Sequence, residues 1–100
     1  MAPERLFIAT YIMTNRPRGT LYTGVTSNLQ QRILQHREGA IPGFTRDHKL
    51  KHLVWFQPFE LMTDAIQREK SIKRYLRDWK INLIEQDNPR WQDLSLAWNL

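Results

Sequence analysis

The sequence predicts an α+β fold in which a small three-stranded mixed or antiparallel sheet is flanked by helices, in the order β-β-α-β-α-α. Residues 6–14 and 19–26 are rich in β-branched and aromatic types on either side of a turn, and residues 52–57 form a third such run. Apolar residues recur at helical spacing between and after these runs. These elements fit one domain that spans residues 1–100.

The first two strands should form a hairpin, because turn-forming residues separate them. If the loop is 15–18, Thr14 pairs with Gly19, and Tyr11 then lies directly opposite Tyr22 on one face of the sheet. A slip of one residue would separate the two rings. This register is therefore a specific expectation.

A helix should follow the hairpin. Ser27 begins a capping box whose fourth position is Gln30, and the helix is expected over about 28–38, ending near Gly39. Two glycines, a proline and several charges then predict a loop at 39–51.

The second half should hold one strand and two helices. The strand at 52–57 is ended by Pro58. Thr63 is placed to cap a helix over about 64–76. A further helix is expected at 79–85.

The motif Asp-Asn-Pro at 87–89 should break the chain. We expect the core at about 6–86 and a tail at 87–100. A short helix in that tail should pack its Trp residues on the body.

Composition limits the class of protein. Hydrophobic residues make up 41%, which is enough for a core and argues against disorder. The lack of Cys excludes disulfides, thiolate zinc sites and cysteine nucleophiles, and it fits a reducing compartment. No apolar run approaches the roughly 20 residues that span a membrane, and no signal peptide is recognisable. We expect a cytoplasmic protein, associated with the nucleoid if the chain is bacterial.

The chain is basic, with 15 Lys and Arg against 10 Asp and Glu, a net charge of +5. A basic domain of this size points weakly to nucleic acid. An ordinary solvated surface with an excess of Lys and Arg explains the charge equally well.

Polar residues stand beside the apolar stripe of the first helix. Leu29 and Ile33 mark that stripe, and Arg32 and His36 lie four residues apart along its border. Taken singly, Arg32 is typical of a helix cation that reaches water, and His36 of an ordinary residue near a helix end.

Glu69 lies in the middle of an apolar helix face, three residues after Ile66 and three before Ile72. A buried carboxylate needs a partner or a metal ion. One explanation is an ion pair with Lys73 or Arg32, or a place at the helix rim that lets the side chain reach water. Metal binding is the other. If both tyrosines, Arg32, His36 and Glu69 converge, the patch would suit phosphate chemistry.

These residues resemble the GIY-YIG nucleases, a family named for two strand motifs. Ala9-Thr10-Tyr11 stands where GIY is expected, and Tyr22-Thr23-Gly24 stands where YIG is expected. The two tyrosines are eleven residues apart, and Arg32 follows Gly24 by eight. His36 and Glu69 match a histidine of several members and the metal-binding acid. The resemblance covers roughly residues 6–86. The first motif keeps only its tyrosine, and Val25 replaces a Lys found in some members.

The resemblance implies a divalent-metal-dependent endonuclease that hydrolyses DNA. Glu69 would hold one Mg²⁺ or Mn²⁺, and Arg32 would pair with phosphate oxygens. Tyr22 is the favoured group for activating water, with Tyr11 as its partner, and His36 would act as proton relay or phosphate contact. A tyrosine at the usual pKa of about 10 is a poor base, so nearby cations would have to lower it. The alternative is a nucleic-acid-binding module that keeps the fold without cleaving.

The expected substrate is DNA read by shape rather than sequence, whether branched, nicked or single-stranded, and a protein partner could target the enzyme. The basic residues of the later helices could form a phosphate-contacting ridge or simply keep that face soluble. The residues assigned to substrate binding are Gly24, Thr45, Arg46, Lys70, Lys73, Arg74 and Arg77.

Overall fold

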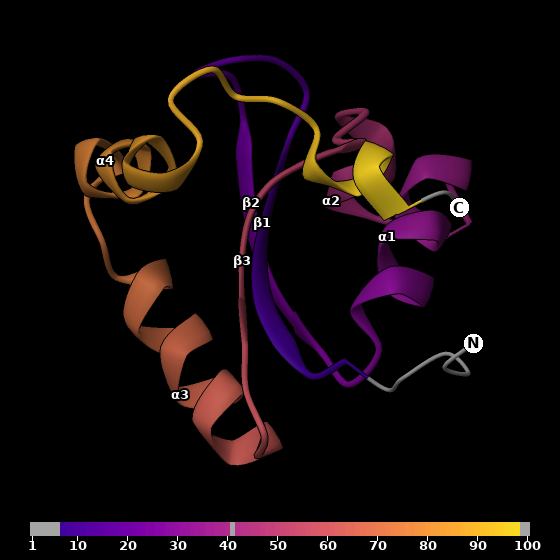
Figure 1. Ribbon diagram of the computed structural model, residues 1–100. Coiled ribbons are helices and arrows are strands. Elements are labelled where there is room, and N and C mark those ends of the chain that lie inside the picture. Colours follow the sequence, from indigo (N-terminus) through magenta and orange to yellow (C-terminus); the bar gives the residue numbers. More distant parts are fainter. Residues whose placement is uncertain (1–6, 41, 99–100) are drawn as a thin grey trace.

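The computed structural model describes residues 7–40 and 42–98. Its centre is a three-stranded sheet formed by β1 (Ala9–Thr14), β2 (Leu21–Thr26) and β3 (His52–Pro58) in the order β2-β1-β3. Both strand pairs are antiparallel, so β2 and β3 are the two edges of the sheet (Figure 1). The predicted α+β fold is confirmed, and its sheet is antiparallel throughout.

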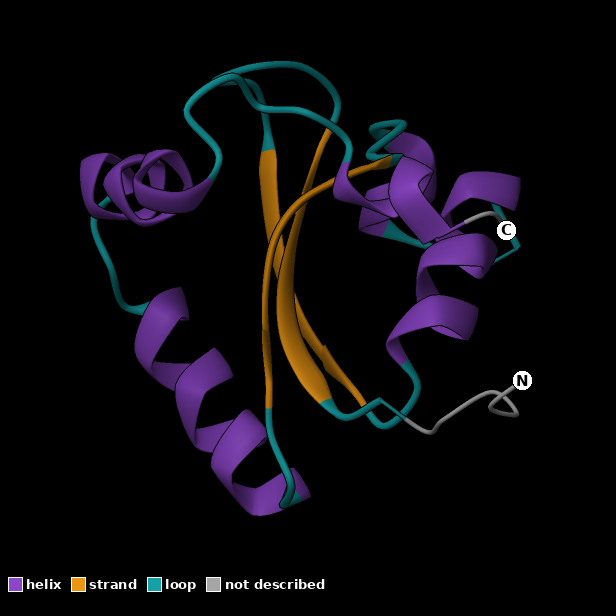
Figure 2. Cartoon of the chain, in the orientation of Figure 1, coloured by secondary structure: helices purple, strands orange, loops and turns teal. Residues whose placement is uncertain are grey.

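Helices cover the sheet in two layers (Figure 2). On one face lie α1 (Leu29–Glu38), α2 (Phe44–Asp47) and the 3-10 helix η1 (Leu94–Trp98). On the other lie α3 (Met62–Lys73), which packs on β1 and β2, and α4 (Arg77–Asp87), which packs on β3. Among the described residues, none of these helices has the length and apolar character needed to cross a bilayer.

The register of the hairpin differs from the expected one. Thr14 pairs with Leu21 instead of Gly19, so Tyr11 faces Gly24 and Met13 faces Tyr22. The loop contains more residues than expected, and hydrogen bonds from its own side chains stabilise it. The Thr14 hydroxyl donates to the Arg16 carbonyl, and the Asn15 side chain accepts from the Thr20 backbone N–H.

This shift of two residues keeps the side chains on their expected faces, because the side-chain period of a strand is two. Tyr11 and Tyr22 therefore still share a face, but they are diagonal neighbours instead of a directly opposed pair.

The caps of α1 show why this segment is helical. The N-cap is Asn28, whose side chain accepts from the Gln31 backbone N–H at 3.3 Å, so the expected capping role of Ser27 is wrong by one residue. The helix ends at Gly39, whose φ of 69° is left-handed, as expected for a glycine C-cap.

The predicted loop at 39–51 holds the short helix α2. Gly43 at its start has a φ of 122°, a conformation that favours glycine. After the helix, the Leu50 backbone N–H donates to the Thr45 carbonyl at 2.8 Å, and the Leu50 side chain is fully buried. The sequence signals for a loop missed these packed residues.

The later helices are displaced from their expected bounds. α3 is capped by Leu61 instead of Thr63 and ends at Lys73. Leu76, at the end of the expected helix, lies outside α3 and is 65% exposed. α4 extends two residues further at each end than the expected 79–85.

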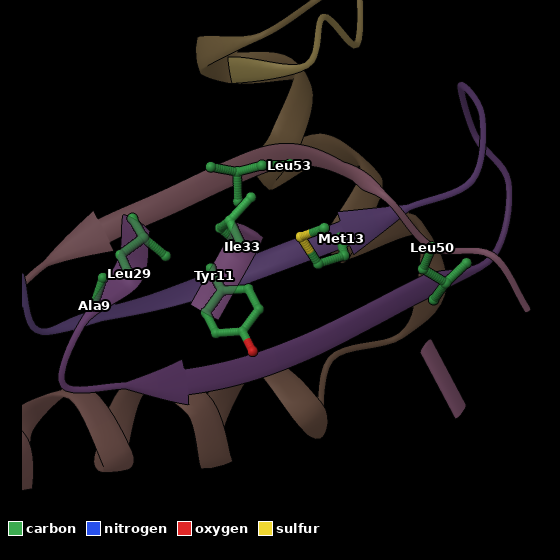
Figure 3. Close-up of a cluster of buried hydrophobic side chains, with 7 residues drawn as sticks. All are labelled: Ala9, Tyr11, Met13, Leu29, Ile33, Leu50 and Leu53. Atoms are coloured by element: carbon green, nitrogen blue, oxygen red, sulfur yellow. The ribbon is translucent and has the colours of Figure 1, made fainter. Parts of the chain in front are cut away.

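Two apolar cores lie on the two faces of the sheet. The first joins β1, α1 and the start of β3, and Figure 3 shows its buried members. The second lies under α3 and α4. The first contains Ala9, Tyr11, Met13, Leu29, Ile33, Leu50 and Leu53, and the second contains Ile12, Val54, Trp55, Ile72, Ile84 and Trp91.

A β-bulge in β3 explains why the consecutive residues Val54 and Trp55 both belong to the second core. Ile12 pairs with Trp55 and Met13 pairs with Leu53, so Val54 is the extra residue. The Asn88 side-chain amide donates to the Val54 carbonyl at 3.0 Å. The segment after α4 thus satisfies a backbone group that the strand pairing leaves free.

Candidate active site

Tyr11 crosses the edge strand of the sheet. Its buried ring belongs to the first core, and its hydroxyl is directed toward β2 (Figure 3). It passes over Gly24, where an added Cβ would lie 2.6 Å from both the ring carbon Cζ and the hydroxyl of Tyr11. A side chain at position 24 would therefore block this crossing. Gly24, assigned to substrate binding from the sequence, makes room for a candidate catalytic residue.

The Tyr11 hydroxyl begins a buried chain of hydrogen bonds. It lies 2.9 Å from Nε2 of His36 on α1, and Nδ1 of His36 lies 3.1 Å from the Thr45 hydroxyl on α2. His36 is only 4% exposed and Thr45 only 5%. The chain joins a strand and two helices through side chains alone, and it uses both ring nitrogens of His36.

The buried site shifts the proton affinity of both rings. Burial, helped by the positive charge of Arg32, lowers the pKa of His36 to about 4. Burial, followed by the nearby Tyr22, raises the pKa of Tyr11 well above its usual value. At neutral pH the site therefore holds a neutral imidazole and a protonated phenol. Either Tyr11 donates to His36, which donates to Thr45, or both bonds run the other way.

Tyr22, on the edge strand β2, lies beside this chain of hydrogen bonds. Its ring centroid is 6.3 Å from that of Tyr11 and 5.9 Å from that of His36. The ring is only partly buried, whereas that of Tyr11 is 2% exposed. Of the two phenols, Tyr22 is the one that an incoming molecule can reach more easily.

Arg32 and Glu69 come from helices on opposite faces of the sheet, α1 and α3. Both charges nevertheless act on Tyr11, because Arg32 lowers and Glu69 raises its pKa, each by less than burial does. Arg32 and Glu69 are thus both close enough to the Tyr11 phenol to act on it electrostatically, although they come from opposite faces of the sheet.

Glu69 has an ion-pair partner within its own helix. Its Oε2 lies 3.1 Å from Nζ of Lys73, one turn further along α3. The Glu69 side chain is 16% exposed and the Lys73 side chain 53%, so the pair opens to water on the lysine side. Such a pair is weak and easily exchanged. The two explanations offered for Glu69 are therefore compatible.

The donor set suits a hard cation that keeps most of its water. In the described part of the chain no group of three or more His, Asp or Glu side chains is placed to hold a metal ion. Glu69 offers one carboxylate, and Mg²⁺ and Mn²⁺ sites commonly combine one or two carboxylates with waters and substrate phosphate oxygens. An ion of this type fits Glu69, whereas a zinc-type site with several protein ligands does not.

The residues assigned to substrate binding are scattered. Thr45 is buried against His36, so it positions the ring. Arg77 donates to the backbone carbonyls of Arg18 and Gly19 and so braces the hairpin loop. Arg46 is exposed and lies 3.7 Å from Asp47. The remaining three, Lys70, Lys73 and Arg74, lie on or just after α3 and are exposed.

Two rings beside the site, those of Phe44 and His48, were not predicted from the sequence. Phe44 stacks with Tyr22 at a centroid distance of 6.4 Å and with His48 at 4.1 Å. A phenylalanine and a histidine four residues apart are a signal of neighbours on one helix face. That signal went unused because the segment was expected to be a loop.

The chain is similar in sequence to a known catalytic domain and to bacterial proteins of its family. A profile of the GIY-YIG catalytic domain, a nuclease domain, matches residues 7–82. UPF0213 proteins of Staphylococcus aureus strains Mu3, N315 and MW2 are each 34% identical over 68 residues, which is 68% of this chain and 83% of the relative. No solved structure matches the chain. The chain belongs to the GIY-YIG family, whose nuclease fold implies a nucleic-acid substrate and hydrolase chemistry.

Proposed function

We propose that the protein is a divalent-metal-dependent endonuclease that hydrolyses phosphodiester bonds in DNA with low sequence specificity, directed by the structure of the DNA. The observation that carries the proposal is the position of the Tyr11 hydroxyl. It is bonded to His36, lies beside Tyr22, and has a pKa that responds to the charges of both Arg32 and Glu69. Phenol, guanidinium and carboxylate groups thus serve one place at the β2 edge.

The two tyrosines have different roles in this proposal. Burial keeps the Tyr11 phenol protonated, so it acts as a hydrogen-bond donor and not as a base. The more accessible Tyr22 orients the attacking water and accepts its proton. His36 is a positioning residue, because both its nitrogens are engaged within the protein and fix the place of Tyr11.

Charge that develops on the phosphate is stabilised by Arg32, which can donate to two non-bridging oxygens at once. Glu69 would hold the Mg²⁺ or Mn²⁺ ion, which when bound supplies Lewis-acid polarisation of the phosphate and neutralises the leaving oxygen. Lys73 then gives up its place on the carboxylate and becomes free to contact the substrate backbone.

Low sequence specificity is supported by the kind of contacts available. Lys70 and Arg74 are exposed on the α3 side, and the chain carries a net charge of +5. Contacts from such side chains to phosphates give affinity without reading bases. Discrimination among DNA forms then depends on which of them fits the β2 edge.

The direct test is cleavage of labelled DNA that is intact, nicked, flapped or single-stranded, with Mn²⁺ and with EDTA. We expect metal-dependent cuts that fall by at least about 100-fold in Glu69→Gln, since several kcal/mol of charge stabilisation are lost. The matched control is Glu60→Gln, an exposed carboxylate before α3, which should cut like the wild type.

Cuts that survive EDTA, or a Glu69→Gln variant as active as the wild type, would overturn the mechanism. DNA binding that is retained in the wild type without any cuts would instead establish the alternative, a binding module that has kept the fold.

A further inference from the structure

A row of three aromatic rings runs outward from the candidate active site. Tyr22 stacks with Phe44 at a centroid distance of 6.4 Å and an interplanar angle of 25°, and Phe44 stacks with His48 at 4.1 Å and 23°. The first ring is a candidate catalytic residue and the last is exposed. We call Phe44 and His48 the aromatic platform.

The platform is held in a fixed position relative to the site. Thr45, next to Phe44, is buried and bonded to His36. The His48 ring Nδ1 donates to the Phe44 carbonyl at 3.0 Å, which fixes the His48 ring over the Phe44 ring. Buried Leu50 anchors the end of the segment. The inner side of α2 thus belongs to the Tyr11–His36 chain, while its outer side presents two rings.

Phe44 is 47% exposed, although a phenylalanine ring gains by burial. Exposed cations occupy neighbouring positions of the segment, because Arg46 lies on the same helix and Lys49 directly follows His48. A peptide-binding surface would need a groove for several apolar side chains. Stacked rings in a segment that also carries exposed cations instead match the two parts of a nucleotide, a π-face and a phosphate.

We propose that the aromatic platform stacks one unpaired nucleobase of the strand to be cut, next to the phosphate held at Tyr22. The base extends the row beyond His48 and covers the open part of Phe44. A base within intact duplex has both faces covered by its neighbours, so the platform favours DNA with an unpaired base beside the cleavage position. This inference rests on the proposed nuclease function and names the feature of the substrate that the site recognises.

The test measures binding, so it does not depend on cleavage. Flapped DNA molecules of one sequence, whose junction fixes the binding register, are titrated against the full chain in EDTA by fluorescence anisotropy. Each carries a single abasic residue at a different position of the unpaired strand. Removal of one particular base should weaken binding by about 5- to 100-fold, the range for stacking on an aromatic side chain. Removal of the other bases should have smaller effects.

The variants identify the side chain responsible. Phe44→Ala should bind the flapped DNA without an abasic residue as weakly as the wild type binds the sensitive abasic one, and it should no longer distinguish the two. Phe44→Trp keeps a ring and should retain the discrimination. Phe44→Leu keeps apolar bulk without a ring and should lose it. Thermal melting checks that all three variants fold.

A flat abasic scan in the wild type, or full discrimination in Phe44→Leu, would overturn the platform. Cleavage data separate the two proposals, because an enzyme with metal-dependent cuts and a flat scan has the proposed function without the platform. A protein that senses one base but makes no cuts has the platform without the proposed function.

Discussion

The two faces of the sheet use buried polar groups in different ways. Under α3 and α4, the Thr10 hydroxyl donates to the Ala65 carbonyl at 2.7 Å, and the Asn88 amide donates to the Val54 carbonyl at 3.0 Å. Both bonds end on backbone and fasten one element to another. Under α1 and α2, the buried bonds join the side chains of Tyr11, His36 and Thr45 to one another.

The difference separates structural from functional use of buried polarity. A side chain that satisfies a backbone carbonyl removes a cost that the fold itself creates. A network of hydrogen-bonded side chains places polar groups in the core, and each of these groups then needs a partner. Apolar side chains at the same positions would need none. We therefore expect substitutions in the core under α3 and α4 to affect mainly stability, and substitutions under α1 and α2 to affect chemistry as well. Glu69 on α3, the proposed metal ligand, is the exception.

The largest expected effect on stability comes from Ile84→Ala. Ile84 on α4 is fully buried, so the free energy of unfolding should fall by about 2–5 kcal/mol. Its KM and kcat, measured well below the melting temperature, should match the wild type. The matched variant Ile33→Ala, next to Arg32 on the other face, should lose both stability and kcat. A folded Ile84→Ala protein with reduced kcat would show that the two faces are not separate.

The pH dependence of stability should carry the signature of His36. Its pKa of about 4 in the folded protein lies below the ordinary value near 6.5. The unfolded chain thus binds more protons between these values, and stability falls as pH falls through this window. The loss should be about 1–2 kcal/mol by pH 5, and it should become negligible above about pH 7.

The matched control is His36→Gln, which keeps a hydrogen-bonding side chain without titrating. Chemical denaturation from pH 6.5 to 5 is the measurement, because most carboxylates stay ionised there. Equal slopes in the wild type and His36→Gln would contradict a neutral, buried His36.

The smallest effect is expected from Lys73→Met, which removes the exposed half of the Glu69 ion pair. Stability should change by less than about 0.5 kcal/mol. Because the carboxylate no longer has a competing cation, the Mn²⁺ concentration for half-maximal cleavage should fall by about two- to fivefold. A metal titration of initial cleavage rates measures this. A higher metal requirement would mean that Lys73 assists the ion and does not compete with it.

The sequence predicted the strands and helices better than the register and the loops that connect them. The strands and α1 carry strong local signals, and both tyrosines fell on their common face because an even shift in register leaves the faces unchanged. The register itself depended on hydrogen bonds from Thr14 and Asn15 within the loop. A turn assignment from residue types alone does not contain these bonds.

The candidate site was predictable as a set of residues but not as a network. Spacing places Arg32 and His36 on one side of α1, but it does not show that His36 meets Thr45 from a segment expected to be a loop. Nor does it show that Gly24 leaves room for Tyr11, since that contact lies between two strands. The roles of these residues, and the single domain over 1–100, stay predictions.

The bulge at Val54 bears on how short a working chain can be made. The segment that matches the family profile ends at residue 82, and it contains every candidate catalytic residue. A protein trimmed to that length would nonetheless lack Asn88 and leave the buried Val54 carbonyl without its donor. The segment that holds the candidate catalytic residues is therefore shorter than the segment that the fold requires. A protein trimmed to the family profile would lose the residue that completes the hydrogen bonding of β3.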